Sequence, residues 1–220
     1  MKVLVACEES QVICSNFRKL NIEAYSCDIL DCSGGHPEWH IKQDVLPLLD
    51  GNCEFKTCDG VNHKIDGKWD LLICHPICTY LTITGNRWFN IEKYGDKARE
   101  RYKKRDEAAE FFMRFVNADC EHIAVENPVC IMSTRYRKPD QIINPFQFGH
   151  KQQKKTCLWL KNLPKLKETN NVYTEMMKLP EKERTAIWQM GSGHAKERSK
   201  TFPGIAKAMA EQWGAYLEGI

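Results

Sequence analysis

The sequence lacks any long apolar stretch. Its 220 residues contain no run of about 18 consecutive apolar side chains, the length that a membrane-spanning helix requires. The opening residues, MKVLVACEES, turn acidic after one short apolar segment, which is unlike a secretory leader. We therefore expect a cytoplasmic protein without membrane contacts. Linkers rich in Gly, Ser or Pro are also missing, so we expect residues 1–220 to form a single domain.

The spacing C-x-x-C is absent as well, although the chain has 11 cysteines. Without a leader, we expect these thiols to be reduced rather than paired in disulfides. Side chains of metal-binding types occur in two neighbouring loops: Cys32, His36, His40, Cys53, Cys58 and His63. Their spacing fits no common zinc site, so we expect no metal, with a structural zinc as the alternative. His36 and Glu38 match the H-x-E of zinc deaminases, but the P-C-x-x-C that completes that motif is missing.

A large excess of charge of one sign is missing too. The net charge is +3, which is too small by itself to indicate a nucleic-acid partner. The distribution says more, because residues 130–167 carry nine Lys or Arg against a single acid, Asp140. Phosphates are the commonest partners of such a local basic face, and a solvated loop face is the alternative.

The amino-terminal segment reads as a strand, a turn, a helix and a second strand. The strand is predicted at Lys2–Ala6, the helix at Val12–Leu20 and the second strand at Glu23–Cys27, closed by Asp28. An acid at this position can accept hydrogen bonds from both hydroxyls of a ribose, which indicates a cofactor containing a nucleoside. The first turn lacks the glycines that bind a pyrophosphate. S-adenosylmethionine has no phosphate and would fit this arrangement.

A second acid, Asp44, follows a short third strand. It could accept a hydrogen bond from the amino group of an adenine, or it could cap the turn VLPLL that comes next. Residues 51–68 alternate in polarity around Asp-Gly turns, which predicts a surface hairpin inserted in the domain.

The stretch Trp69–Thr82, WDLLICHPICTYLT, contains the strongest chemical signal. Asp70–Cys74 predicts a buried strand, and Pro76 forces a loop at its carboxyl end. Ligands bind at that edge of an open parallel sheet. Cys78 is therefore a candidate nucleophile, with a small apolar residue at the end of a strand as the structural alternative.

A second strand end carries a carboxylate and an amide. A long amphipathic helix is predicted at about Lys97–Asn117, and a strand at His122–Val125 ends in Glu126, Asn127 and Pro128. If this strand lies beside the preceding one, both polar side chains lie near Cys78. A capping role for Asn127 is the alternative.

The carboxyl-terminal part is less regular. We expect an irregular stretch at Lys138–Lys151, a buried strand at Thr156–Leu160, a reduced connector at about 161–190 with a helical segment from Glu181 to Met190, and a last helix at Gly204–Leu217. The order of strands and helices predicts an α/β fold with a central, mostly parallel sheet and helices on both faces.

Taken in order, these motifs resemble the DNA (cytosine-5) methyltransferase family, and in particular its small phage- and prophage-borne members. DLLICHPICTYLT and AVENP resemble the nucleophile loop and the Glu-Asn motif, and QDV around Asp44 resembles the adenine-contacting motif. QQKKT before CLWL resembles the strand that holds the target nucleotide. TFPGIAKAMAEQW resembles the closing motif that completes the cofactor pocket.

The resemblance implies a Rossmann-like methyltransferase fold that transfers a methyl group from S-adenosylmethionine to C5 of cytosine in DNA, with the target base flipped out or single-stranded. It implies a monomer or weak dimer, in the host cytoplasm if a phage encodes it. Cys78 would attack C6, Glu126 would act as the acid at N3 with its pKa raised by burial, and Asn127 would hold the two loops together. The expected cofactor-binding residues are Ala6, Cys7, Glu8, Ser10, Asp28, Ile29, Asp44, Val45, His75 and Pro76. The expected DNA-binding residues are Arg135, Arg137, Lys138, Gln152, Lys154 and Thr156.

The chain departs from the family pattern at several points. Ile77 replaces the second proline of the nucleophile loop, and Glu8 and Ser10 stand where the family has glycines. Lys154 and Thr156 replace arginines, and only about thirty residues lie where the family inserts a target-recognition domain. Two alternatives therefore stay open: methylation of a free nucleotide or RNA, and a catalytically silent module that binds DNA or a partner.

Overall fold

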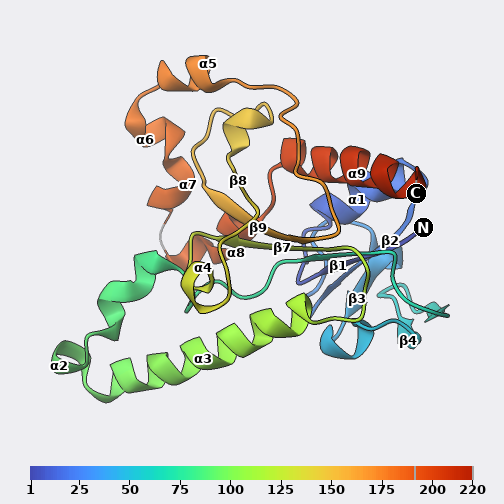
Figure 1. Cartoon of the computed structure of the whole chain (residues 1–220), viewed down its shortest axis with the longest axis horizontal. Helices are drawn as coiled ribbons and strands as arrows, with labels where there is room; N and C mark the ends of the chain where they lie inside the picture. Colours follow the sequence, from blue (N-terminus) through green and yellow to red (C-terminus); the bar gives the residue numbers. More distant parts are fainter. Residues whose placement is uncertain (191, 220) are drawn as a thin grey trace.

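A computed structural model describes residues 1–190 and 192–219. A seven-stranded sheet with the order β3-β2-β1-β6-β7-β9-β8 forms its centre (Figure 1). Strand β9 pairs antiparallel with both β7 and β8, and the other pairings are parallel. The predicted α/β architecture with a mostly parallel sheet is therefore confirmed. The strands are β1 (Lys2–Ala6), β2 (Glu23–Asp28), β3 (His40–Lys42), β6 (Leu71–Cys74), β7 (Ile123–Pro128), β8 (Gln141–Ile143) and β9 (Thr156–Lys161).

Helices cover both faces of the sheet. They are α1 (Val12–Lys19), α2 (Ile91–Tyr94), α3 (Asp96–Val116), α4 (Met132–Arg135), α5 (Tyr173–Met177), α6 (Glu181–Arg184), α7 (Ala186–Gln189), α8 (Ala195–Ser199) and α9 (Pro203–Glu218). Figure 1 shows α1 and α9 close together on one face and α3 along the other. No helix in the described ranges is both long and apolar enough to cross a membrane.

Side chains alternate between the two faces along the central strands, which explains the two hydrophobic layers, one on each face of the sheet. In β1, Val3 and Val5 pack against α1 and α9, while Leu4 and Ala6 pack on the side of α3. Strand β6 alternates in the same way, and all four of its side chains are buried. Successive side chains of a strand point to opposite faces, so a strand covered on both sides reads as a continuous apolar run.

Two predictions for the second half of the chain were wrong. The stretch expected to be irregular contains β8, which is short and pairs only with β9. The helical segment expected at 181–190 is divided at Thr185 into α6 and α7. The Thr185 hydroxyl donates a hydrogen bond to the carbonyl of Glu181 one turn earlier, and this contact competes with regular helix geometry.

The hairpin predicted at residues 51–68 is present. Strands β4 (Cys53–Lys56) and β5 (Asn62–Ile65) pair antiparallel outside the main sheet. Gly51 has φ of 71°, and a Cβ there would lie 2.2 Å from the carbonyl oxygen of Gly67. Only glycine fits the position where the two ends of the insertion close on each other.

The sheet order reverses between β1 and β6. The chain proceeds outward from β1 through β2 to β3, and then returns to the other side of β1 with β6 and β7. In open parallel sheets this reversal opens a crevice at the carboxyl ends of the strands, and ligands bind there. We call the region between the carboxyl ends of β1 and β6 the switch-point crevice. The loop after β1 (residues 7–11, the first loop) and the loop after β6 (residues 75–78, the cysteine loop) border it.

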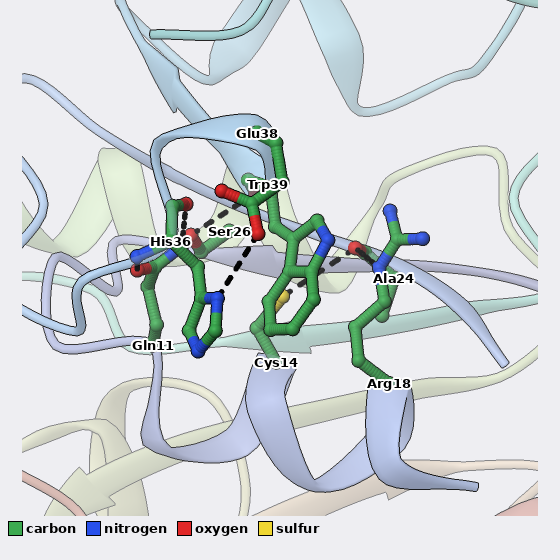
Figure 2. A network of polar contacts seen from close by, with 8 residues as sticks. All are labelled: Gln11, Cys14, Arg18, Ala24, Ser26, His36, Glu38 and Trp39. Atoms are coloured by element: carbon green, nitrogen blue, oxygen red, sulfur yellow. Dashed lines mark hydrogen bonds and ion pairs between the residues drawn. The ribbon is translucent and has the colours of Figure 1, made fainter. Parts of the chain in front are cut away.

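Hydrogen bonds connect the first loop to the segment that precedes β3. Gln11 donates to the carbonyl of His36 at 2.8 Å and accepts from its N–H at 3.1 Å, and the His36 ring stacks on Trp39 (Figure 2). Figure 2 also shows Cys14 and Arg18 of α1 directed at the carbonyl of Ala24 in β2, which accepts from both. These contacts fix α1 and the first loop against the strands beside them.

Candidate active site

The cysteine loop presents Cys78 at the edge of the sheet. Its side chain is half-buried, and its carbonyl accepts hydrogen bonds from the N–H groups of Leu81 and Thr82, each at 3.0 Å. The neighbouring Ile77 is exposed. The turn is therefore ordered by its own backbone, and it leaves the thiol at the mouth of the switch-point crevice.

Glu126 lies at the end of the adjacent strand. Cys74 of β6 pairs with Val125 of β7, which places the next residue of each strand, His75 and Glu126, side by side. His75 Nδ1 lies 2.8 Å from Glu126 Oε2, and the two side chains are only 12% and 14% exposed. His75 Nε2 is buried and has no hydrogen-bond partner in the described part of the chain. Nδ1 thus contacts Glu126, while Nε2 can form a hydrogen bond with a ligand.

Asn127 joins the two strand ends. Its Nδ2 donates to the carbonyl of Pro76 at 2.8 Å, and its side chain is fully buried. Its Oδ1 has no hydrogen-bond partner among the described residues. Because a buried amide oxygen without a partner is costly, this atom is a candidate contact for a bound ligand.

The pKa expected for Glu126 was wrong in direction. Burial raises the pKa of this carboxyl. The hydrogen bond and charge of His75, together with the charge of Lys154, lower the pKa by more than burial raises it, so the net shift is downward. The sequence showed the apolar neighbours Val125 and Pro128. It did not show that an imidazole would lie within hydrogen-bond distance.

The Cys78 thiol has opposing neighbours. Burial raises its pKa, and the negative charge of Glu126 raises it again, while Lys154 and Arg198 lower it. The hydrogen bond from Asn127 to the Pro76 carbonyl and the 2.8 Å contact of His75 with Glu126 join the cysteine loop to the end of β7. Neutralising Glu126 would remove one of the two influences that oppose the thiolate.

Helix α8 lies across the crevice. Lys196 pairs with Glu9 of the first loop at 3.3 Å, and Lys154 Nζ donates to the carbonyl of Arg198 at 2.9 Å. The five residues of α8 therefore contact both the β1 side and the β9 side of the site. Nothing in the spacing of the sequence indicated that α8 would contact both Glu9 and Lys154.

The first loop is engaged in the fold. Glu8 is buried, and its carboxylate accepts from the N–H groups of Ile13 and Cys14 at 2.7 and 3.2 Å, at the start of α1. Helix N-termini attract anions, so Glu8 occupies the place where a phosphate would otherwise bind. Its pKa is raised by burial, against the lowering influence of His75 and the two N–H groups.

The expected cofactor contacts are only partly available. Ala6 is wholly buried and its carbonyl accepts from the N–H of His75, while the Glu8 carboxylate is engaged with α1, so neither side chain can reach a cofactor. Val45 is buried in the core and Pro76 is buried beside Asn127. Ser10 is half-buried in the first loop.

Asp28, Asp44 and Cys7 lie together at the β2 end of the crevice. Burial raises the pKa of Cys7, and the charges of Asp28 and then Asp44 also raise it, which places both acids near this thiol. Asp44 also accepts from the N–H of Leu46, the capping role considered as an alternative. Ile29, beside Asp28, is 71% exposed. Asp28 and Asp44 thus both act on Cys7 at the ends of β2 and β3.

The expected DNA-binding residues separate into two groups. Lys154 faces the site, whereas Arg135 pairs with Asp106 and Arg137 pairs with Asp140 and the carbonyl of Leu160. Leu160 pairs with Ala124, toward the amino end of β7, so Arg137 lies away from the strand ends that carry Glu126. Arg135 is therefore paired with Asp106 of α3 and Arg137 with Asp140 three residues along the chain, and the structure does not bring Arg137 to the strand end that carries Glu126.

The remaining expected contacts are also engaged internally. Gln152 donates to the carbonyl of Glu183 at 2.8 Å, and Thr156 donates to the carbonyl of Lys154 at 3.3 Å. Lys138 is exposed beside Arg137. Lys154 is therefore the member of the expected set that the structure brings to Cys78.

The cysteines and histidines of the 32–63 region form no metal site within the described residues. His40 is buried between Ser26 Oγ and the carbonyl of Leu30, and His63 contacts the hydroxyls of Tyr25 and Thr57. Hydrogen bonding within the fold accounts for these two rings.

No protein-family model matches the chain, and no curated protein sequence is significantly similar to it.

Proposed function

We propose that this protein is a methyltransferase that transfers the methyl group of S-adenosylmethionine to C5 of a cytosine in DNA, through a covalent adduct on Cys78. The observation that carries the proposal is that the Asn127–Pro76 hydrogen bond and the His75–Glu126 contact join the loop that carries Cys78 to the end of β7 that carries Glu126. The resemblance of the two motifs that supply Cys78 and Glu126 supports the same chemistry. A sheet order that reverses at β1 and β6, with helices on both faces, supports a Rossmann-like methyltransferase fold.

The β1–β3 side of the crevice fits S-adenosylmethionine. Asp28 would accept from ribose hydroxyls, Asp44 from the adenine amino group, and Ile29 would cover part of the base. Glu8 fills the phosphate position at α1, which suits a nucleoside that lacks phosphate. When bound, the cofactor supplies an electrophilic methyl group, and the acidic surroundings that include Glu9 favour its positive sulfonium.

Cys78 makes C5 of the cytosine nucleophilic. The thiol proton passes to water, the thiolate forms a bond to C6, the electron pair of the C5–C6 double bond becomes available at C5, and N3 takes a proton. After C5 has accepted the methyl group, loss of the C5 proton to water restores the double bond and expels the Cys78 thiolate, and N3 returns its proton to the Glu126–His75 pair. The base reaches the crevice only when it is outside a stacked duplex.

Glu126 and His75 together supply the proton at N3. The pair can exist as a carboxylate with an imidazolium, or as a carboxylic acid with an imidazole. A base that enters the crevice excludes water and so favours the uncharged form, in which Glu126 can donate. The same proton shift removes a negative charge beside Cys78 and lowers the pKa of the thiol. Substrate binding thus activates the acid and the nucleophile in one event.

The test is mass spectrometry of nucleosides after incubation with S-adenosylmethionine. We expect 5-methylcytosine in DNA. Parallel reactions with dCMP and with RNA distinguish the alternatives of a free nucleotide or RNA substrate, because the label would then appear only there. Absence of methylated product from all substrates, with no calorimetric binding of S-adenosylmethionine, would contradict the proposal and favour a silent binding module.

A further inference from the structure

The surface beside the cysteine loop combines aromatic rings with cations. Five residues after Cys78, a 3₁₀ segment (Ile83–Phe89) begins and leads through α2 into α3. Residues 80–105 carry eight Lys or Arg and three acids. The exposed large apolar side chains of residues 77–102 are Ile77, Ile83, Trp88, Ile91 and Tyr102. A concentration of exposed apolar groups of this kind marks an interaction site.

Trp88 and Tyr94 form one aromatic pair on this surface. Their ring centroids lie 5.3 Å apart, and Trp88 is 43% exposed. The guanidinium of Arg87 lies 5.0 Å from the Trp88 ring, and Lys93 Nζ lies 5.3 Å from the Tyr94 ring. The exposed Trp88 ring and the half-buried Tyr94 ring therefore each have a cation against them, the combination that recognises both the bases and the phosphates of nucleic acid.

A second aromatic site, at Tyr80, continues the surface to the cysteine loop. The Arg101 guanidinium lies 5.2 Å from the rings of both Tyr80 and Phe89, and Lys104 Nζ lies 5.9 Å from Tyr80. Arg101 Nε is buried and lacks a hydrogen-bond partner within the described ranges. Arg101 also forms no ion pair with any described acid, unlike Arg135 or Arg137.

Arg105 holds this surface in place. It is buried, stacks on the Phe89 ring at 3.3 Å, and donates to the carbonyl of Tyr80 at 2.9 Å and to Asn86 Oδ1 at 2.7 Å. The segment is thus fixed on α3 before any partner binds. A preorganised surface loses little conformational entropy on binding.

We propose that Tyr80, Arg87, Trp88, Lys93, Tyr94 and Arg101, here called the stacking platform, bind a single strand of DNA beside the target cytosine. The proposal deepens the proposed function, on which its choice of DNA rests, by naming a single strand rather than a duplex as the substrate. Stacked bases in a duplex expose no faces to such rings, whereas a single strand offers both base faces and phosphates. Charge complementarity and continuity with Cys78 through Tyr80 argue for this occupant.

The test is fluorescence anisotropy of the full chain with a labelled DNA strand of about 12 nucleotides, within the range that single-strand sites cover. Trp88→Ala should weaken binding at least about fivefold, and Trp88→Phe should restore most of it, because stacking is worth this much per base. Arg101→Ala should weaken binding and reduce the slope of log affinity against log salt by about 0.7.

Matched controls lie elsewhere on the chain. Tyr216→Ala removes an aromatic ring that is 40% exposed on α9, and Arg114→Ala removes an exposed cation from the last turns of α3. Both should bind the strand like the wild type. Circular dichroism verifies that every variant is folded.

Four results would overturn the inference: unchanged affinity in folded Trp88→Ala and Arg101→Ala, equal or tighter binding of the matching duplex, tighter binding of the matching RNA, or a dimer that Trp88→Ala dissolves. Strand binding through the platform without any 5-methylcytosine would refute the methyltransferase instead. Methylation with no platform effect would refute the platform alone.

Discussion

The two loops that border the switch-point crevice use their polar side chains in opposite ways. In the first loop, Glu8 caps α1 and the Gln11 amide forms two hydrogen bonds with the backbone of His36. The polar atoms of these two side chains therefore have partners within the fold. At the cysteine loop and the adjoining end of β7, His75 Nε2 and Asn127 Oδ1 are buried and lack partners in the described structure. Glu8 and Gln11 are thus satisfied within the fold, whereas Glu9 of the same loop pairs with Lys196 and its buried carboxylate has no hydrogen-bond partner among the described residues. The cysteine loop and the end of β7 offer hydrogen-bonding groups to a ligand.

This difference separates stability from chemistry. Groups whose partners are supplied by the chain contribute to folding, and their removal leaves buried donors unpaired. Buried groups without partners cost folding free energy, and such costs are characteristic of functional sites. We therefore expect substitutions in the first loop to lower stability, and substitutions around Cys78 and Glu126 to lower the rate with little loss of stability.

The largest expected effect is that of Cys78→Ser. Methyl transfer should fall by more than about 10³-fold, because a serine hydroxyl is a much weaker nucleophile toward C6. Calorimetry should show unchanged binding of S-adenosylmethionine. Cys58→Ser, which alters an exposed thiol in the hairpin, is the control and should keep full activity. Comparable activity of the Cys78→Ser and Cys58→Ser proteins would exclude covalent catalysis.

Glu126→Gln should lower the rate by about 10²- to 10⁴-fold, the usual contribution of a positioned acid. An amide can still accept from His75, so the urea midpoint at neutral pH should fall less than that of Glu8→Ala. The comparison between the loops would fail if this variant lost stability while keeping its methyl-transfer rate.

Glu8→Ala should lower stability and leave the methyl-transfer rate nearly unchanged. It leaves the buried N–H groups of Ile13 and Cys14 without an acceptor, at a cost of about 1–3 kcal/mol in the free energy of unfolding. Urea denaturation measures this loss, and the rate per folded molecule should stay near that of the wild type. A large fall in that rate would show that the first loop also takes part in catalysis.

His75 is a positioning residue in this account. His75→Ala removes the donor to Glu126 and should lower the rate about tenfold, the value of a hydrogen bond to a charged group. His75→Asn can place Nδ2 near the position of Nδ1 and should recover most of the rate at the optimum pH. Because asparagine does not titrate, its pH–rate profile should lose the imidazole limb. An unchanged profile would remove His75 from the proton shift.

The smallest expected effect is a difference of sign in the pH dependence of stability. Glu126 has a lowered pKa, so its ionised form stabilises the fold above the carboxyl's unfolded value of about 4.3, and this is lost as pH falls through the lower folded value. Glu8 has a raised pKa, so its contribution is present below about 4.3 and is lost as pH rises through the folded value. Stability should therefore depend less on pH below about 4.3 in Glu126→Gln, and less on pH above about 4.3 in Glu8→Gln. Urea midpoints measured across acid pH test this, and a reduced pH dependence over the same range in both variants would contradict the assignment.

Much of the fold could be predicted from the sequence because local patterns determine it. Strand β1 and its helix follow from apolar periodicity, and Pro76 marks the end of β6. Strand β8 was missed because three residues carry no period, and its stability comes from pairing with β9.

The candidate site was predictable only in part. Cys78, Glu126 and Asn127 follow strands, so topology alone brings them to one edge. The 2.8 Å contact of His75 with Glu126 depends on the register between β6 and β7, and the contacts of α8 with Glu9 and Lys154 depend on how α8 crosses the crevice. Neither is encoded in the spacing of residues, and the first of them reverses the expected pKa shift of Glu126.

The central claim, covalent attack by Cys78 at the open side of the crevice, is tested most directly by trapping the adduct. A DNA strand in which 5-fluorocytosine replaces cytosine can accept the methyl group, but it has no C5 proton to lose, so the sulfur stays bound to C6. After incubation with S-adenosylmethionine, peptide mass spectrometry should find the modified, methylated base on Cys78 and on none of the other ten cysteines. An adduct on a different cysteine, or methylation of ordinary cytosine with no adduct on the fluorinated strand, would contradict the account.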